Sequence, residues 1–147
     1  MNKGGFQKQY SQVQIQTANK GKLIVMLYQA AIKFMKKGLL ALDKNDMEAK
    51  GNDLIKAQDI ILELLYALDQ EMLDSGNELA VNLQRLYLYS YSRLVQANIH
   101  LDHKVIEEII AIMTNLMEAW EAVVAGGGGG GTAPNPPDPS PGVVLTG

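Results

Sequence analysis

The sequence predicts an all-α protein: an antiparallel four-helix bundle with a short extended N-terminal segment and a disordered C-terminal tail rich in glycine and proline. The chain has 147 residues, and all five prolines lie between positions 134 and 141. A long proline-free stretch favours uninterrupted helices. Apolar residues recur there at steps of three and four, whereas no stretch alternates with period two. We therefore expect an N-terminal segment at 1–18, the bundle at 19–125 and a flexible tail at 126–147.

The first expected helix begins near Asn19, a residue type suited to an N-cap, and ends at the turn-forming sequence ALDKND. Its apolar stripe comprises Ile24, Leu27, Ala31, Phe34 and Gly38. The second expected helix opens at Asn45, with Glu48 three residues later in the manner of a capping box. Its stripe runs through Leu54, Ala57, Ile61, Leu64 and Leu68.

The third expected helix opens at Ser75, with Glu78 three residues later, after the turn sequence EMLDSGN. Its stripe comprises Leu83, Tyr87, Ser90, Leu94, Ala97 and Leu101. The fourth is capped by Asp102, and its stripe comprises Ile106, Ile109, Met113, Leu116, Trp120 and Val123. Short connections between helices of this length imply antiparallel neighbours.

Each stripe is wider than one core-facing line. The additional apolar residues are Ile55, Leu62 and Leu65, then Leu88, Tyr91, Val95 and Ile99, then Ile110, Met117 and Val124. Ordinary breadth of a four-helix core explains most of them, but a bundle of this size cannot bury them all, so part of this surface should form a binding groove. Tyr87, Tyr89 and Tyr91 alternate along one helix, so at least one should lie at the surface near Arg93.

The composition excludes several classes of protein. The chain has no cysteine, which excludes disulfides and thiolate chemistry. Its N-terminus has no signal-peptide core, and its longest charge-free stretches are too short to span a membrane, so we expect a cytoplasmic protein without membrane insertion. Residues 1–50 carry nine lysines against three acids, whereas the remainder is acidic. The basic third either marks an anionic partner or, as we favour, is neutralised by the later helices. The acidic net balance gives no reason to expect nucleic acid.

The sequence contains no constellation typical of an enzyme or a cofactor site. His100 and His103 flank Asp102 in a turn, and turn histidines without further ligands are usually inert. There is no inward-facing Glu-x-x-His pair, no histidine on an apolar stripe and no phosphate-binding glycine motif. We interpret the chain as a binding protein with no cofactor, no metal and no enzymatic activity.

One segment carries a specific resemblance. The sequence YSQVQIQTANKGKLIVMLYQAAIKF, residues 10–34, strongly resembles the start of the flagellar secretion chaperone family FliS. The likeness continues in GNDLIKAQDIILEL and NLQRLYLYSYSRLVQANI and ends with Ala119 and Trp120, so it covers residues 6–124. The chain departs from the family at Asn19-Lys20-Gly21-Lys22, where Ser-Pro and an acid are usual, and in the tail from Gly126.

The resemblance implies a cytosolic chaperone that binds the C-terminal segment of flagellin, prevents premature polymerisation and presents the subunit to the export gate of the flagellar type III secretion apparatus. We expect the free protein to be a monomer or weak dimer. The region implied by the family and the apolar residues off the core line together predict these partner contacts: Tyr10, Val13, Ile15, Tyr28, Asn52, Ile55, Leu62, Tyr87, Leu88, Tyr91 and Val95.

A further expectation concerns residues 6–17, whose apolar side chains have no helix of their own. We expect this segment to lie over the groove when no guest is bound. The alternative to a chaperone is a structural bundle, a homodimer or adaptor without a flagellin client, in which the broad stripes close an interface between subunits.

Overall fold

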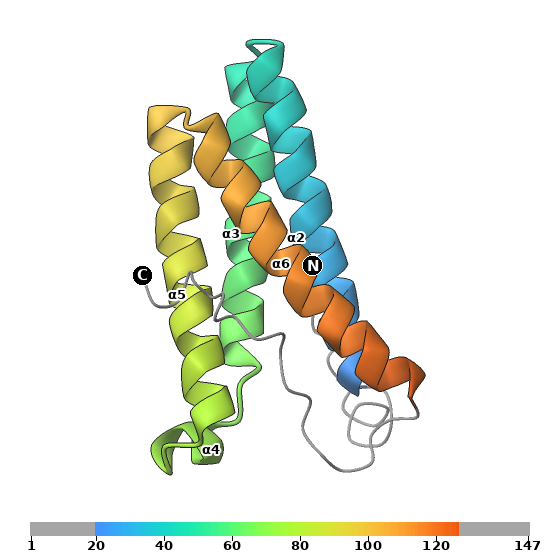
Figure 1. Cartoon of the computed structure of the whole chain (residues 1–147). Helices are drawn as coiled ribbons and strands as arrows, with labels where there is room; N and C mark the ends of the chain where they lie inside the picture. The colour runs from blue at the N-terminus through green and yellow to red at the C-terminus, as the bar shows by residue number, and fades with distance from the viewer. Residues whose placement is uncertain (1–19, 127–147) are drawn as a thin grey trace, which may run out of the picture.

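The computed structural model describes residues 20–126, which form five helices (Figure 1). The four long ones are α2 (Lys20–Asp43), α3 (Met47–Tyr66), α5 (Glu78–His100) and α6 (His103–Ala125). Between α3 and α5 lies α4 (Gln70–Asp74), a helix of 5 residues. Residues 20–126 contain no strand, so the prediction of an all-α helical bundle is confirmed. The expected N-terminal segment and tail lie outside the described residues.

The long helices pack as a ring in which each has two neighbours. Helix α2 contacts α3 and α6, and α5 contacts the same two helices from the opposite corner. Figure 1 shows α5 and α6 close together at the turn that joins them and diverging toward the end that carries α4. The bundle is therefore closed at one end and splayed at the other.

Side-chain caps fix where the helices begin. Asp46 caps α3 by accepting a hydrogen bond from the Ala49 amide at 3.1 Å, and Asn77 caps α5 through the Ala80 amide at 2.9 Å. The expected caps Asn45 and Ser75 were therefore wrong by one and two residues. Asp102 caps α6 through the Val105 amide at 3.2 Å, as predicted. Helix α3 ends at Tyr66, so Leu68, the last residue of its expected apolar stripe, lies two residues beyond the helix.

The core lies where the apolar stripes predicted it. Its fully buried side chains include Leu54, Ile61, Leu94, Ile106, Ile109 and Met113. Leu101 is an exception, because it ends α5 in the left-handed conformation with φ of 55° and stays 45% exposed. Gly38 allows α2 and α3 to approach closely, since a Cβ there would lie 2.6 Å from Leu54 Cδ2.

One buried charge joins two helix ends. The Lys50 side chain is on the inner side of α3 and only 8% of the residue is exposed. Its ammonium donates to the Asn98 carbonyl at 3.0 Å and to Asn98 Oδ1 at 2.7 Å. Asn98 lies in the last turn of α5, where carbonyls have no helical partner and the dipole is negative. Lys50 thus caps α5 and holds the start of α3 beside the end of α5.

Candidate functional site

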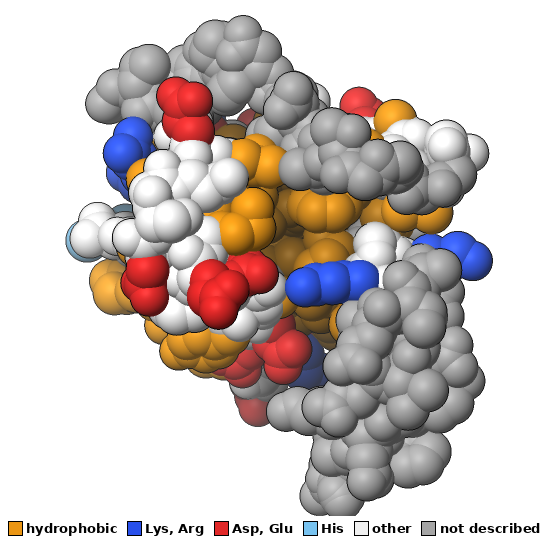
Figure 2. Space-filling model, turned by 90° about the horizontal axis from the view of Figure 1, so that it is seen from below, with side chains coloured by type: hydrophobic (Ala, Val, Ile, Leu, Met, Phe, Trp, Pro, Cys, Tyr) orange, Lys and Arg blue, Asp and Glu red, His pale blue; other side chains and the backbone are white. Residues whose placement is uncertain are grey.

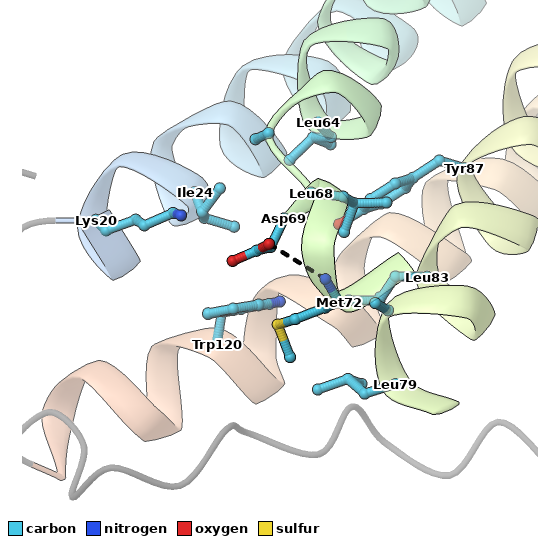
Figure 3. Close-up of a pocket in the computed structure, with 12 residues that line it drawn as sticks. Lys20, Ile24, Leu64, Leu68, Asp69, Met72, Leu79, Leu83, Tyr87 and Trp120 are labelled. Atoms are coloured by element: carbon cyan, nitrogen blue, oxygen red, sulfur yellow. Dashed lines mark hydrogen bonds between the residues drawn. The ribbon is translucent and has the colours of Figure 1, made fainter. Parts of the chain in front are cut away.

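An apolar pocket opens at the splayed end of the bundle, and we call it the end pocket. It is a cavity of about 150 Å³ to which α2, α3, α4, α5 and α6 all contribute. Figure 2 views this end and shows hydrophobic side chains gathered in a hollow between the helices. The residues around it in Figure 3 include Ile24, Leu64, Leu68, Met72, Leu83 and Trp120. A cavity of this size accommodates one ring-sized apolar group.

The short helix α4 shapes one side of the end pocket. Asp69 caps α4 by accepting hydrogen bonds from the amides of Glu71 at 2.8 Å and Met72 at 3.2 Å. This cap fixes the turn that brings Met72 beside Leu68 and Leu83 (Figure 3). Lys20 and Asp69 supply the charged side chains of the lining. The pocket therefore has apolar walls and two opposite charges, a combination suited to an apolar side chain of a peptide.

Two tyrosines of the core form a hydrogen-bonded pair, and one of them, Tyr87, lines the end pocket. Tyr28 of α2 is 0% exposed and Tyr87 of α5 is 2% exposed. Their hydroxyl groups share a hydrogen bond, and their rings are tilted by 45° with centroids 6.5 Å apart. Burial raises the pKa of Tyr87 to about 12 and raises the pKa of Tyr28 well above its ordinary value. Both remain uncharged at neutral pH.

The burial of Tyr28 and Tyr87 limits how these two predicted contact residues could reach a partner. Tyr28 and Tyr87 were expected to contact a partner, but the described bundle encloses both side chains. Each hydroxyl satisfies the other, so neither needs water or a partner to complete its hydrogen bonding. Tyr87 also lines the end pocket, so a guest reaches it only from inside that cavity.

A second apolar surface runs along α3 and α5. Its most exposed members are Tyr66 at 76% and Ile99 at 68%, followed by Ile55 and Leu88 at 48% each. We define the α3–α5 face as Ile55, Leu62 and Tyr66 of α3 with Leu88, Tyr91, Val95 and Ile99 of α5. Leu62, Tyr91 and Val95 are half-buried, and Ile99 is exposed. The sequence had singled out six of these seven residues as apolar positions off the core line.

Contacts already described place the two halves of this face side by side. On α3, Asp53 approaches Gly38 of α2, and Ile55 is two residues further, about 200° round the helix. Ile55 and Leu62 therefore lie on the side of α3 away from α2. On α5, Asn98 meets Lys50 of α3, and Tyr91 lies two turns earlier on the same side. Because α3 and α5 pack against each other and run antiparallel, the two rows lie on neighbouring helices.

The remaining predicted contacts have different places. Asn52 is exposed on α3, one turn before Ile55. Tyr10, Val13 and Ile15 lie outside the described residues. Met72 lines the end pocket but was not predicted as a site residue, because EMLDSGN was interpreted as a turn. Asp69 two residues before Glu71 was the local signal for the start of a helix there.

A polar cluster closes the other side of α5. Tyr89 donates a hydrogen bond to Glu108 of α6 at 2.7 Å, and Arg93 lies 3.8 Å from the same carboxylate. The Arg93 guanidinium also lies 6.0 Å from the centre of the Tyr89 ring. Tyr89 and Tyr91 are both partly exposed, which confirms the expectation of a surface tyrosine near Arg93. This cluster joins α5 to α6.

Residues 20–126 contain neither a metal-binding cluster nor a membrane-spanning helix. No group of three or more histidine, aspartate and glutamate side chains is placed to hold a metal ion there. His103 lies 3.4 Å from Asp43 and 3.5 Å from Glu107, which places it in surface ion pairs when it is protonated. In the same range, no helix has the length and apolar character needed to cross a membrane.

Comparisons with known proteins identify relatives. Residues 2–127 match the family described as flagellar protein FliS. A flagellar secretion chaperone FliS from Bacillus subtilis is 37% identical over 115 residues, which cover 78% of this chain and 83% of that protein. The flagellar secretion chaperone FliS of Salmonella typhimurium is 40% identical over 121 residues, which cover 79% of this chain and 87% of that protein. The chaperone FliSB of Pseudomonas aeruginosa is 36% identical over 120 residues, covering 79% and 93%.

Proposed function

Because the chain belongs to the FliS family, we propose that it is a flagellar export chaperone that binds the C-terminal segment of flagellin. The relatives are named flagellar secretion chaperones, and this chain covers most of their length. The observation that carries the proposal is the α3–α5 face, where Ile55 and Leu88 are half-exposed apolar side chains on a folded bundle. A surface of this kind fits an amphipathic helix of a guest.

The proposed contact explains how a small bundle holds a disordered guest. Such a guest loses conformational freedom on binding, so it needs a large apolar contact area to compensate. The α3–α5 face offers seven apolar residues along two antiparallel helices, and the end pocket adds room for one anchoring side chain. A guest helix held there has its own apolar face covered, which prevents it from packing against other flagellin molecules.

We extend the proposal to the N-terminal segment, with Tyr10, Val13 and Ile15 as its contact residues. Lys20 lines the end pocket, and Ile15 precedes it by five residues, a span of at most about 18 Å in an extended chain. Ile15 is thus within reach of the pocket. In the proposal, this segment covers the apolar surface of the free chaperone and gives way when the guest binds.

The remaining steps of the proposal follow from the same family. The chaperone acts in the cytoplasm, keeps flagellin from polymerising early and delivers it to the export gate of the secretion apparatus. The free chaperone is a monomer or a weak dimer. The competing hypothesis is a structural dimer without a client, in which the α3–α5 face is closed by a second copy.

The test is a titration with a fluorescent peptide that comprises the C-terminal segment of flagellin. The double variant Ile55→Ser and Leu88→Ser removes two apolar contacts of about 1 kcal/mol each, so we expect the affinity to fall 10- to 100-fold. Both side chains are half-exposed, so the bundle should keep its helical circular dichroism. The matched control is Leu40→Ser, which changes a side chain 58% exposed on α2, away from the face.

Sedimentation of the chaperone with and without the same peptide separates the chaperone hypothesis from the structural dimer. Sedimentation should show a monomer that forms a one-to-one complex with the peptide. A tight dimer that ignores the peptide, or equal losses in the double variant and the Leu40 control, would contradict the proposal.

A further inference from the structure

The outward side of α2 is a basic surface with apolar ends. Its exposed residues recur at helical spacing, and α2 contains no acidic residue before Asp43. We define the α2 outer face as Met26, Lys33, Lys36, Lys37 and Leu40, all of them exposed. Met26 and Leu40, at its two ends, are 59% and 58% exposed. The lysines lie between these two apolar side chains.

Positive charge is gathered around one aromatic ring beside this face. The ammonium groups of Lys33 and Lys37 lie 5.1 Å and 5.6 Å from the centre of the half-buried Phe34 ring. Lys56 of the neighbouring helix α3 lies 5.3 Å from the same ring. Attraction to the ring holds these cations near one another even though they repel each other.

Carboxylates of the bundle do not neutralise this cluster directly. The ion pairs found within residues 20–126 are those of Arg93 with Glu108 and of His103 with Asp43 and Glu107. None of them involves a lysine of α2. We had favoured neutralisation of the basic first helix by the later acidic helices, and among the described residues no direct ion pair provides it. The alternative that the sequence left open, an anionic partner, therefore gains support.

We propose that the α2 outer face binds an acidic amphipathic helix of a second protein, one other than the client. Met26 and Leu40 are 14 residues apart, about 21 Å along the helix, which is the length of four turns. A guest helix of similar length would place carboxylates opposite the lysines and one apolar residue against each end. The Phe34 ring gathers the ammonium groups of Lys33, Lys37 and Lys56 within 5.6 Å of its centre, so the carboxylates would meet a concentrated positive charge.

The charges next to the face favour a narrow guest over a broad one. Asp53 and Asp59 of α3 stand on either side of Lys56 in the sequence, and the protein carries a net charge of −3. A membrane of anionic lipids is broad enough to meet these acids as well as the lysines. A single helix, about 10 Å across, is narrow enough to lie along the lysines of α2. We therefore assign the surface to a peptide helix.

The position of α2 allows both partners to bind at once. In the ring of helices α2 contacts α3 and α6, while α5 lies diagonally opposite. The α3–α5 face lies on the side of α3 away from α2, as argued above from Asp53 and Ile55. A helix on the α2 outer face would therefore leave the α3–α5 face accessible. This inference does not depend on flagellin being the client.

The test uses a synthetic probe, a labelled helical peptide of alanine and glutamate with its glutamates on one side and two leucines 14 residues apart. We expect one-to-one binding by fluorescence anisotropy, weakened by salt because the contacts are charged. The triple variant Lys33→Glu, Lys36→Glu and Lys37→Glu should bind the probe at least tenfold more weakly. The double variant Met26→Ser and Leu40→Ser should lose about threefold, which simple charge attraction would not predict.

Three controls make the result decisive. The quadruple variant Asn82→Glu, Arg85→Glu, Gln96→Glu and Lys104→Glu changes the net charge equally with exposed residues of α5 and α6, and it should bind within twofold of the wild type. A shuffled probe with its glutamates all round the helix should bind weakly. An added flagellin C-terminal peptide should not displace the probe. Equal losses in the lysine triple variant and the quadruple control, competition by the flagellin peptide, or lysine-dependent binding to phosphatidylserine vesicles without probe binding would overturn the proposal.

Discussion

The Tyr28–Tyr87 pair concentrates the polar chemistry of the core in one hydrogen bond. Both side chains are buried, and burying a hydroxyl without a partner costs about 1–3 kcal/mol. The shared hydrogen bond removes that cost for both rings, so the bundle tolerates two tyrosines where phenylalanine would also fit. Burial disfavours the ionised form of either phenol, so the pair is most stable while both are neutral.

This pair predicts a loss of stability in alkali. In the folded bundle the pKa of Tyr87 is about 12, raised by burial, and that of Tyr28 is raised in the same direction, whereas an unfolded tyrosine ionises near 10. The folded state therefore holds protons that the unfolded state releases. The contribution is complete below pH 10 and is lost as the pH rises from 10 through the folded pKa, at up to about 1.4 kcal/mol per pH unit for each tyrosine.

Urea unfolding between pH 8 and pH 12 measures this effect. The double variant Tyr28→Phe and Tyr87→Phe should lose stability less steeply than the wild type above pH 10. At neutral pH the single variant Tyr28→Phe should cost about 1–2 kcal/mol, because it leaves the Tyr87 hydroxyl unpaired, and the second substitution should recover part of that cost. Tyr66→Phe, at a side chain 76% exposed, is the matched control. Parallel slopes in the wild type and the double variant would contradict the assignment.

The same pair marks a limit of residue-level prediction from the sequence. Periodicity placed Tyr87 on the core stripe, and the crowding of tyrosines on α5 suggested a surface role for it as well. Only the position of Tyr28 on α2, 59 residues away, shows that its hydroxyl has a buried partner. By contrast, Ile55 and Leu88 were identified correctly as apolar residues off the core, because helical spacing alone decides that.

At the scale of the elements, the four long helices were predictable, whereas the short helix α4 was not and the helix starts were predicted less accurately. The sequences DKND and DSGN each offer several residues that can act as a cap. Asp46 and Asn77 perform the role because the preceding residues are taken up by the turns: Asn45 adopts a positive φ of 63° and Ser75 ends α4. Tertiary packing selects among these neighbours, and local sequence does not reveal the choice.

The contact between α2 and α3 gives a prediction at this scale. Replacing Gly38 by alanine adds up to about 1 kcal/mol of helix propensity but drives a Cβ to 2.6 Å from Leu54 Cδ2 and 2.9 Å from its Cγ. Leu54 is 0% exposed, so its side chain could move aside only by displacing other core residues. Overpacking of this kind costs about 1–3 kcal/mol, so we expect Gly38→Ala to lower the free energy of unfolding by about 1 kcal/mol or more.

Gly51 of α3 provides the matched control in the same assay. A Cβ at Gly51 would meet nothing within 4 Å, so Gly51→Ala should raise the free energy of unfolding by up to about 1 kcal/mol. Combining Gly38→Ala with Leu54→Ala should cost less than the sum of the two single changes, because the shorter side chain relieves the clash. Additive costs would show that α2 and α3 do not meet as described.

At the scale of the whole molecule, the bundle was predictable and its pocket was not. Four apolar stripes with short connections specify a ring of antiparallel helices. The end pocket depends instead on how far α6 diverges from α5, and its lining combines Ile24, Leu68 and Trp120 from distant parts of the sequence. Sequence periodicity assigned those three residues to the core, where the first is buried and the others are only partly buried.

Trp120 offers a direct test of the proposed N-terminal cover. It is the only tryptophan of the chain and lines the end pocket, so its emission reports whether that pocket is wet. If residues 6–17 cover the pocket, the double variant Tyr10→Ser and Ile15→Ser should shift the emission to longer wavelengths. The same variant should bind the flagellin peptide several-fold more tightly, because the cover no longer competes with the guest.

Deleting residues 1–5 is the matched control, because it shortens the chain but keeps all of residues 6–17, the proposed cover. This deletion should leave both the Trp120 emission and the affinity within error of the wild type. In the double variant, a weaker affinity with unchanged emission would mean that Tyr10 and Ile15 contact the guest directly. Unchanged values of both quantities would exclude the cover, since a segment that shields an apolar surface must alter either its hydration or its availability when its anchors are removed.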